Sequence, residues 1–356
     1  MNNFNPSISY LKALGIMLMV LGHACFVSLP MFPQQMPFIN MFHMPIFFIS
    51  AGYCFNDKYI DLPKIFLKNK LKNIWWPYVK WCIVFLCLHN FFYNINIYNN
   101  QYTFKGEVSH LYSVTFMLHK VLIYIFRMQD AEQLLAGYWF LKALFFASII
   151  SWIFIRFIRN PILSIGVLFT ICFLLNMTCW FIPIIQISTQ PFAGALLFLM
   201  GYYFARYKVK IFSLKQIFLS LSLTYVGSYY WSMSMNHLTY DNMFFPFYIC
   251  TALLATWSFY SIFEHLRRLY YFPNMFFNFI GKNTLTILTW HLLAFKVVSL
   301  MIIYIYELPM KRLAEFPVIL EYSHKGWWIV YFIVAILVTG GIAYCNKGIK
   351  NQWLKL

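Results

Sequence analysis

Long apolar runs, separated by short polar stretches, make up almost the whole chain. A membrane-spanning helix needs about 20 predominantly apolar residues. Runs of that kind occupy 10–31, 37–56, 74–94, 136–156, 161–183, 189–206, 214–235, 244–263, 276–306 and 326–346. A shorter apolar stretch, 111–127, is interrupted by His119 and Lys120, so it fits either an eleventh span or a segment in the membrane interface. The pattern predicts an all-α integral membrane protein with about ten transmembrane helices.

The placement of basic residues decides between ten and eleven spans. Cytoplasmic loops of membrane proteins carry an excess of Lys and Arg. With the N-terminus inside and ten spans, every inner connection receives a basic group, whereas the outer loops are close to neutral. The inner groups are Lys58, Lys64, Lys68, Lys70 and Lys72; Arg156 and Arg159; Arg206, Lys208, Lys210 and Lys215; Arg267 and Arg268; and Lys347, Lys350 and Lys355. An eleventh crossing at 111–127 would turn the later groups outward, so we predict both termini in the cytoplasm and one transmembrane domain over 1–356, without a soluble domain.

Composition agrees with this class and excludes others. Of the 356 residues, 62% are hydrophobic and only 10% are charged, too few charges to cover a water-soluble globule. The net charge of +17 comes from short clusters between apolar runs, which indicates topology and not a nucleic-acid partner. None of the eight cysteines forms a C-x-x-C pair, so neither a zinc site nor a secreted disulfide framework is expected.

Ionisable residues inside a membrane are costly and commonly mark a functional site. No Asp or Glu lies at the middle of a predicted span, which argues against proton- and sodium-coupled transporters. Lys12 and His23 are eleven residues apart in the first span, so they project from nearly the same face of a helix, about 16 Å apart along its axis. Lys12, near the cytoplasmic rim, can bind an anionic group, and the imidazole of His23, deeper in the membrane, can act in catalysis. The alternatives are a snorkelling lysine and a histidine that makes an interhelical hydrogen bond.

A second histidine is expected at a comparable depth. Pro30, Pro33 and Pro37 predict a tight hairpin between the first two spans. The hairpin would bring His43 antiparallel to His23, so the two imidazoles can share a cavity. The alternative for His43 is a polar group that is satisfied at a helix start.

Four segments resemble motifs of membrane acyltransferase family 3, in the order of that family. The segments are Lys12 with Gly22-His23; Phe42-His43-Met44-Pro45-Ile46-Phe47-Phe48 with Gly52-Tyr53; Tyr138-Trp139-Phe140-Leu141 with Leu144-Phe145; and Gly281-Lys282-Asn283-Thr284-Leu285 with His291. The resemblance covers the chain from 12 to 291. It implies a ten-span enzyme that moves an acyl group, usually acetyl, from cytoplasmic acyl-coenzyme A to a hydroxyl of a glycan or other acceptor.

The resemblance also implies roles for individual residues. By it, His23 is the catalytic histidine and Lys12 contacts the phosphates of the donor. The family favours Arg at the position of Lys12 and carries an Arg pair before the third span, where this chain has Lys68, Lys70 and Lys72. These lysines can hold the phosphates of coenzyme A, or they can simply mark the cytoplasmic face.

Transfer from a thioester to a hydroxyl needs a base and a group that stabilises the oxyanion. A histidine in the membrane stays neutral and can accept a proton, which fits His23. Candidate oxyanion or orienting donors are Asn40, Tyr138, Trp139 and Lys142. Either an acceptor-side role or a structural role fits His291. No G-x-S-x-G elbow is present, so direct transfer without an acyl-enzyme is expected.

Together with the pattern of spans, the resemblance implies a multi-pass O-acetyltransferase of the bacterial inner membrane. The acceptor is a cell-envelope glycan or a lipid-linked sugar, and acetyl-coenzyme A is a co-substrate that is not permanently bound. One alternative is a membrane-bound O-acyltransferase of the other large class, whose histidine lies later in the chain. Another is a polysaccharide or lipid exporter, or another multi-span transporter, in which Lys and His line a path.

Overall fold

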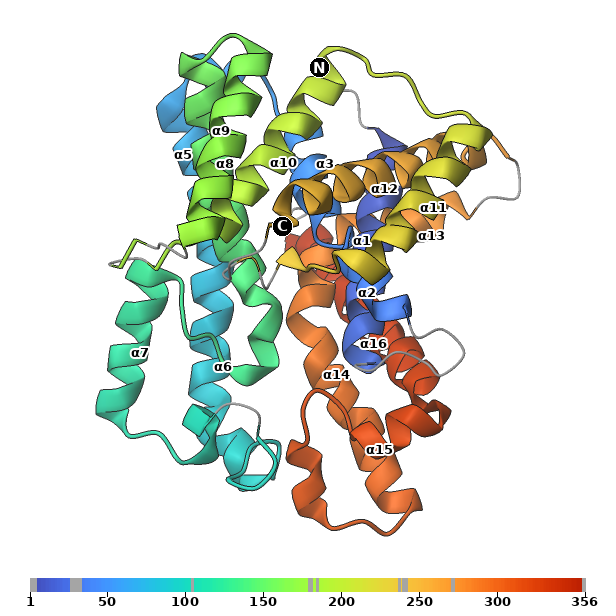
Figure 1. The fold of residues 1–356 in the computed structure, drawn as a ribbon. Coiled ribbons are helices and arrows are strands. Elements are labelled where there is room, and N and C mark those ends of the chain that lie inside the picture. The colour runs from blue at the N-terminus through green and yellow to red at the C-terminus, as the bar shows by residue number, and fades with distance from the viewer. Residues whose placement is uncertain are drawn as a thin grey trace. The chain divides into compact units, whose positions relative to one another are not determined.

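The computed structural model describes residues 5–25, 34–103, 106–178, 182–183, 186–235, 238, 243–269 and 273–353. Helices account for nearly all of the regular structure in this part of the chain (Figure 1), which confirms the predicted all-α class. Its one β-bridge joins Ile182 and Ile187. Pro30, Pro33 and Lys355 lie outside the described residues, as do the side chains of Lys347 and Lys350.

The described helices belong to two compact units, and helix α1 (Pro6–Ala24) contributes to both. The first unit comprises residues 1–15, 32–77 and 140–282. Its main helices after α1 are α2 (Gln35–Asn40), α3 (Pro45–Tyr53), α4 (Lys58–Asp61), α5 (Pro63–Lys70), α8 (Trp139–Phe157), α9 (Pro161–Thr178), α10 (Thr189–Arg206), α11 (Leu214–Tyr230), α12 (Phe245–Leu266) and α13 (Asn274–Lys282). Helices α3 and α10 form its most extensive helix pair.

The second unit comprises residues 16–31, 78–139 and 283–356. Its helices after α1 are α6 (Trp76–Asn94), η2 (Gly106–Ser109), α7 (Val114–Arg127), η3 (Gln133–Tyr138), α14 (Thr284–Ile305), η5 (Met310–Ala314), α15 (Leu320–Tyr322), η6 (Ser323–Trp327) and α16 (Trp328–Trp353). Helices α14 and α16 lie side by side (Figure 1). The short helix η3 packs on α14. The side chain of Ser323 donates a 2.7 Å hydrogen bond to the carbonyl of Ala24 and so ties η6 to the end of α1.

Local sequence signals set several helix starts. Ser213 and Gln216 form a capping box at the start of α11, in which each side chain bonds the backbone of the other residue. The hydroxyl of Ser113 accepts a hydrogen bond from the backbone amide of Phe116 and so caps the start of α7. Pro45 stands in the first turn of α3, where its missing N–H costs no helical hydrogen bond.

Six helical segments are long and apolar enough to cross a membrane, among the residues that the structure describes. They are Pro6–Ala24, Gln133–Phe157, Pro161–Thr178, Phe245–Leu266, Thr284–Ile305 and Leu320–Asn346. The protein is therefore a multi-pass membrane protein. The number of ten spans stays a prediction, because the runs at 74–94, 189–206 and 214–235 form helices outside this set. The cytoplasmic position of both termini also stays a prediction.

Two predicted spans are interrupted. The run 37–56 divides into α2 and α3 around a turn at 41–44, directly before Pro45, whose ring is incompatible with a helix interior. The run 276–306 divides into α13 and α14 at Asn283. The segment 111–127, which we did not count as a span, forms the 14-residue α7. Val114, Leu118, Leu122 and Phe126 form an exposed apolar stripe along α7, which fits a helix lying in the interface.

Candidate active site

A pair of histidines joins the end of α1 to the middle of α14. The Nδ1 atom of His23 lies 2.8 Å from the Nε2 atom of His291. His291 is fully buried and His23 is half-buried. The ring planes differ by only 10°, and the centroids lie 5.1 Å apart. Since the centroids are farther apart than the bonded nitrogens by about one ring diameter, the rings meet edge to edge, which is the geometry of an N–H···N hydrogen bond.

A second buried hydrogen bond joins Tyr138 of η3 to α14. Its hydroxyl is 2.7 Å from the hydroxyl of Thr289, which donates its own proton to the carbonyl of Leu285 at 2.8 Å. Tyr138 must therefore be the donor in the bond to Thr289. The proton of Tyr138 is used in this bond, which holds η3 against α14; its predicted role as an oxyanion or orienting donor stays a prediction.

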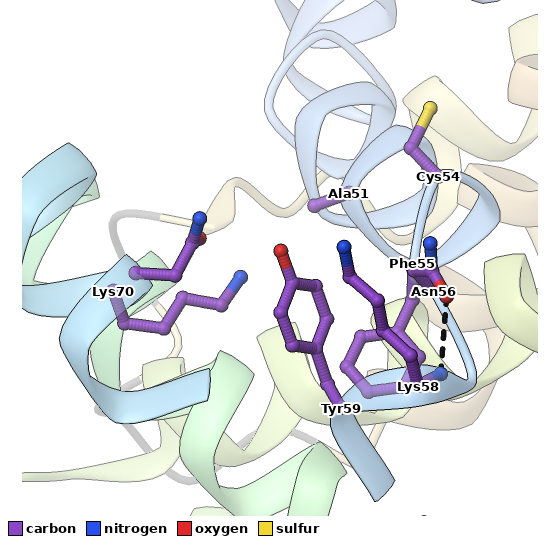
Figure 2. Close-up of a pocket in the computed structure, with 8 residues that line it drawn as sticks. Ala51, Cys54, Phe55, Asn56, Lys58, Tyr59 and Lys70 are labelled. Carbon is purple, nitrogen blue, oxygen red and sulfur yellow. Dashed lines mark hydrogen bonds between the residues drawn. The ribbon is translucent and has the colours of Figure 1, made fainter. Parts of the chain in front are cut away.

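The first unit contains a cavity of about 720 Å³. Its lining comes from the end of α3, the following turn, α4 and the end of α5, and consists of Ala51, Cys54, Phe55, Asn56, Lys58, Tyr59, Asn69 and Lys70. Figure 2 shows the ammonium groups of Lys58 and Lys70 on either side of the Tyr59 hydroxyl. The volume lies within the range of small-molecule sites in proteins.

The charged lining residues of this cavity are both lysines. The nearby carboxylate of Asp57 is engaged elsewhere, because it accepts hydrogen bonds from Tyr202 at 2.9 Å and from Arg206 at 3.1 Å. Partial burial lowers the pKa of Lys70 to about 8, so its ammonium is still mostly charged at neutral pH. The cavity therefore presents two cations, amides and a phenol, which is a set of groups that binds anions.

The structure separates the predicted donor-binding lysines. Lys70 lines the cavity, whereas Lys68 and Lys72 are exposed and are not among the lining residues. Lys12 is half-buried on α1 and lies near Cys54, a residue of the cavity wall. Among the predicted donor contacts, Lys12 and Lys70 are thus the two that the structure associates with the cavity. Cys54, Asn56, Lys58, Tyr59 and Asn69 are lining residues that we did not predict as site residues.

The remaining predicted site residues are not among the lining residues of the cavity. His43 is half-buried in the turn before α3, and its Nδ1 donates a 2.9 Å hydrogen bond to the carbonyl of Ile39, as expected for a polar group satisfied near a helix start. Lys142 reaches the carbonyl of Gln186 at 3.4 Å. Asn40 ends α2 and Trp139 begins α8, and both are half-buried.

A buried carboxylate was missed at the sequence level. Glu132 directly precedes η3, is almost fully buried, and pairs with Nδ1 of the buried His89 at 3.0 Å. The Nε2 atom of His89 lies 2.9 Å from the carbonyl of His110, and the His89 ring stacks on Tyr112. Glu132 precedes its apolar run, and it is buried beside His89 and Tyr98, which are distant in the sequence, so hydropathy gave no signal. The pair connects α6 to the segment that carries Tyr138.

Comparison with known proteins identifies the family. The family model described as an acyltransferase domain matches residues 5–353, nearly the whole chain. Searches of curated proteins and of solved structures found no match. The chain therefore belongs to membrane acyltransferase family 3, and the protein is a membrane acyltransferase.

Proposed function

We propose that this acyltransferase moves an acetyl or related acyl group from cytoplasmic acyl-coenzyme A to a hydroxyl of a cell-envelope glycan or lipid-linked sugar. We place it in the bacterial inner membrane, with ten spans and both termini in the cytoplasm. The observation that carries the proposal is the hydrogen-bonded pairing of His23 with the buried His291 in a chain of an acyltransferase family. Membership of this family favours an enzyme over the alternative of an exporter.

In the proposed reaction His23 is the general base. Its imidazole takes the proton of the acceptor hydroxyl while the oxygen attacks the thioester carbonyl, which gives a tetrahedral oxyanion. Collapse of the oxyanion breaks the carbon–sulfur bond, and the departing coenzyme A thiolate takes the proton back from the imidazolium. The ester product and the free thiol balance the reaction without a covalent acyl-enzyme.

The donor site of the proposal is the cavity lined by Lys58 and Lys70. Coenzyme A carries several phosphate charges, and lysine binds phosphate as a point charge. The amides of Asn56 and Asn69 and the hydroxyl of Tyr59 add hydrogen-bonding groups next to these charges. Lys12, which lies near Cys54 in the cavity wall, contributes a further cation.

The function is tested with purified protein in lipid vesicles supplied with acetyl-coenzyme A that is labelled in the acetyl group. We expect the label to move to a glycan or lipid-linked acceptor, and mass spectrometry of surface glycans from cells with and without the protein identifies the acetylated position. Vesicles without protein are the control. The proposal would be contradicted if the purified protein did not consume acetyl-coenzyme A and cells without the protein kept all of their glycan acetyl groups.

The donor site predicts a pH-dependent affinity for coenzyme A. Because the pKa of Lys70 is lowered to about 8, the side chain is charged below that pH and neutral above it. Affinity is therefore expected to fall as the pH rises from 7 to 9. Lys70→Arg stays charged over this range and should remove this part of the dependence. Lys70→Gln should weaken binding roughly 2- to 5-fold at pH 7, the size of one partly exposed ion pair.

Equilibrium binding of coenzyme A to the purified variants measures this effect. Lys68→Gln is the matched control, because Lys68 carries the same charge two residues away but does not line the cavity. An equal loss of affinity in Lys68→Gln and Lys70→Gln would mean that the lysines act only through the overall charge of the cytoplasmic face.

A further inference from the structure

The hydrogen bonds of His291 determine which of its nitrogens carries a proton. Its Nδ1 lies 3.1 Å from the carbonyl oxygen of Ile287 and 3.0 Å from that of Leu288. Carbonyl oxygens only accept hydrogen bonds, so Nδ1 must be protonated. Among the described residues no carboxylate forms an ion pair with His291, and a buried, uncompensated imidazolium would be costly. His291 is therefore neutral, and its Nε2 carries a lone pair.

That lone pair sets the tautomer of His23. The Nδ1 atom of His23 is 2.8 Å from Nε2 of His291, and two lone pairs at this distance would repel each other. Nδ1 of His23 must therefore be the donor. In a neutral imidazole with a protonated Nδ1, the atom that can accept a further proton is Nε2.

We infer that His291 is a positioning residue that holds His23 as the Nδ1-protonated tautomer and thereby makes Nε2 of His23 the proton-accepting atom of the transfer reaction. This inference rests on the proposed role of His23 as general base. His291 takes the place that a carboxylate has in a Ser-His-Asp triad, but as a neutral acceptor. When Nε2 of His23 takes the acceptor proton, the Nδ1–H···Nε2 bond becomes charge-assisted and stabilises the imidazolium.

The surroundings of α14 are suited to hold His291 in this orientation. The rings of Phe295 and His291 pack in a T-shaped arrangement, with a centroid distance of 5.8 Å and an angle of 86° between the ring planes. One helical turn before His291, the side chain of Leu288 occupies the space beside Gly137, where a Cβ atom would lie 2.7 Å from Leu288 Cδ1. The hydrogen bond from Tyr138 to Thr289 fixes the same turn. The end of α1 is held by the bond from Ser323 to Ala24, one residue after His23.

Two substitutions at position 291 test the inference. His291→Ala removes the acceptor for the His23 proton, so kcat should fall roughly 100-fold, within the range for general-base catalysis, while KM for acetyl-coenzyme A stays unchanged. His291→Gln places an amide oxygen near the position of Nε2 and should recover kcat to within about 10-fold of the wild type. A purely structural role would lower the yield of folded protein in both variants, and the amide would not restore kcat.

The double variant separates this inference from the proposed function. With His23→Ala present, His291→Ala should cause no further loss, because residues that act as one unit are not additive. Full activity of His23→Ala would overturn the role of His23 as base. If His23→Ala is inactive, two results would overturn only the inference about His291. The first is full kcat in His291→Ala, and the second is a kcat of His291→Gln as low as that of His291→Ala. If His291→Ala does not fold, the kcat of His291→Gln decides: a loss of 100-fold or more overturns the inference, and recovery supports it.

Discussion

Replacing His23 by alanine is expected to reduce acyl transfer by about 10²- to 10⁴-fold, the range that general-base catalysis contributes. The variant loses the group that removes the proton from the acceptor hydroxyl, and no carboxylate at the middle of a predicted span can replace it. The affinity for coenzyme A should be unchanged, because the residues that line the cavity are intact. Initial rates of acetyl transfer in lipid vesicles, together with equilibrium binding of coenzyme A, measure both quantities.

His119→Ala is the control for this substitution. His119 is an exposed histidine on α7, and it should be replaceable without effect on transfer or on folding. His43→Ala gives a second comparison, because the bond from His43 to the carbonyl of Ile39 predicts a loss of stability and not a selective loss of kcat. Transfer at the wild-type rate by folded His23→Ala would refute the proposed mechanism.

The helices themselves were largely predictable from the sequence. The run 189–206 coincides with α10, and the run 161–183 begins at the same residue as α9. The two interruptions were not predicted. A hydropathy average counts apolar side chains, and Pro45 and Asn283 change backbone hydrogen bonding without lowering that average enough to divide a run.

The sequence predicted which residues belong to the candidate site, but not which of them contact one another. Lys12 and His23 could be named because an ionisable group in an apolar helix is unusual, and helix geometry places them on one face. The partner of His23 could not be named, since His291 lies 268 residues later and no local pattern encodes a contact of that range. The cavity was missed for a different reason. Its residues lie close together in the sequence, between Ala51 and Lys70, but only the folding of the end of α3, α4 and α5 against one another brings Lys58 and Lys70 to one cavity.

Close approach of α3 to α10 explains why glycine stands at two positions. A Cβ atom at Gly52 would lie 1.8 Å from the carbonyl oxygen of Phe198, and one at Gly201 would lie 2.0 Å from the carbonyl oxygen of Ile49. Both obstacles are backbone atoms, which cannot rotate away as a side chain can. Small residues at helix interfaces allow this kind of approach in membrane proteins. The helix pair of α3 and α10 also adjoins the cavity, because α3 ends at Tyr53, next to Cys54 of the cavity wall.

Gly52→Ala and Gly201→Ala are therefore each expected to destabilise the protein by on the order of 3 kcal/mol, the upper part of the usual range for overpacking. The expected result is a lower midpoint of thermal unfolding in detergent and a smaller yield of monodisperse protein. Gly166→Ala is the matched control: Gly166 is an exposed helical glycine on α9, and a Cβ atom there would meet nothing within 4 Å. It should unfold at the wild-type temperature or slightly above, because alanine favours a helix over glycine. If Gly52→Ala and Gly201→Ala unfolded at the same temperature as Gly166→Ala, the two helices would not depend on this close backbone contact.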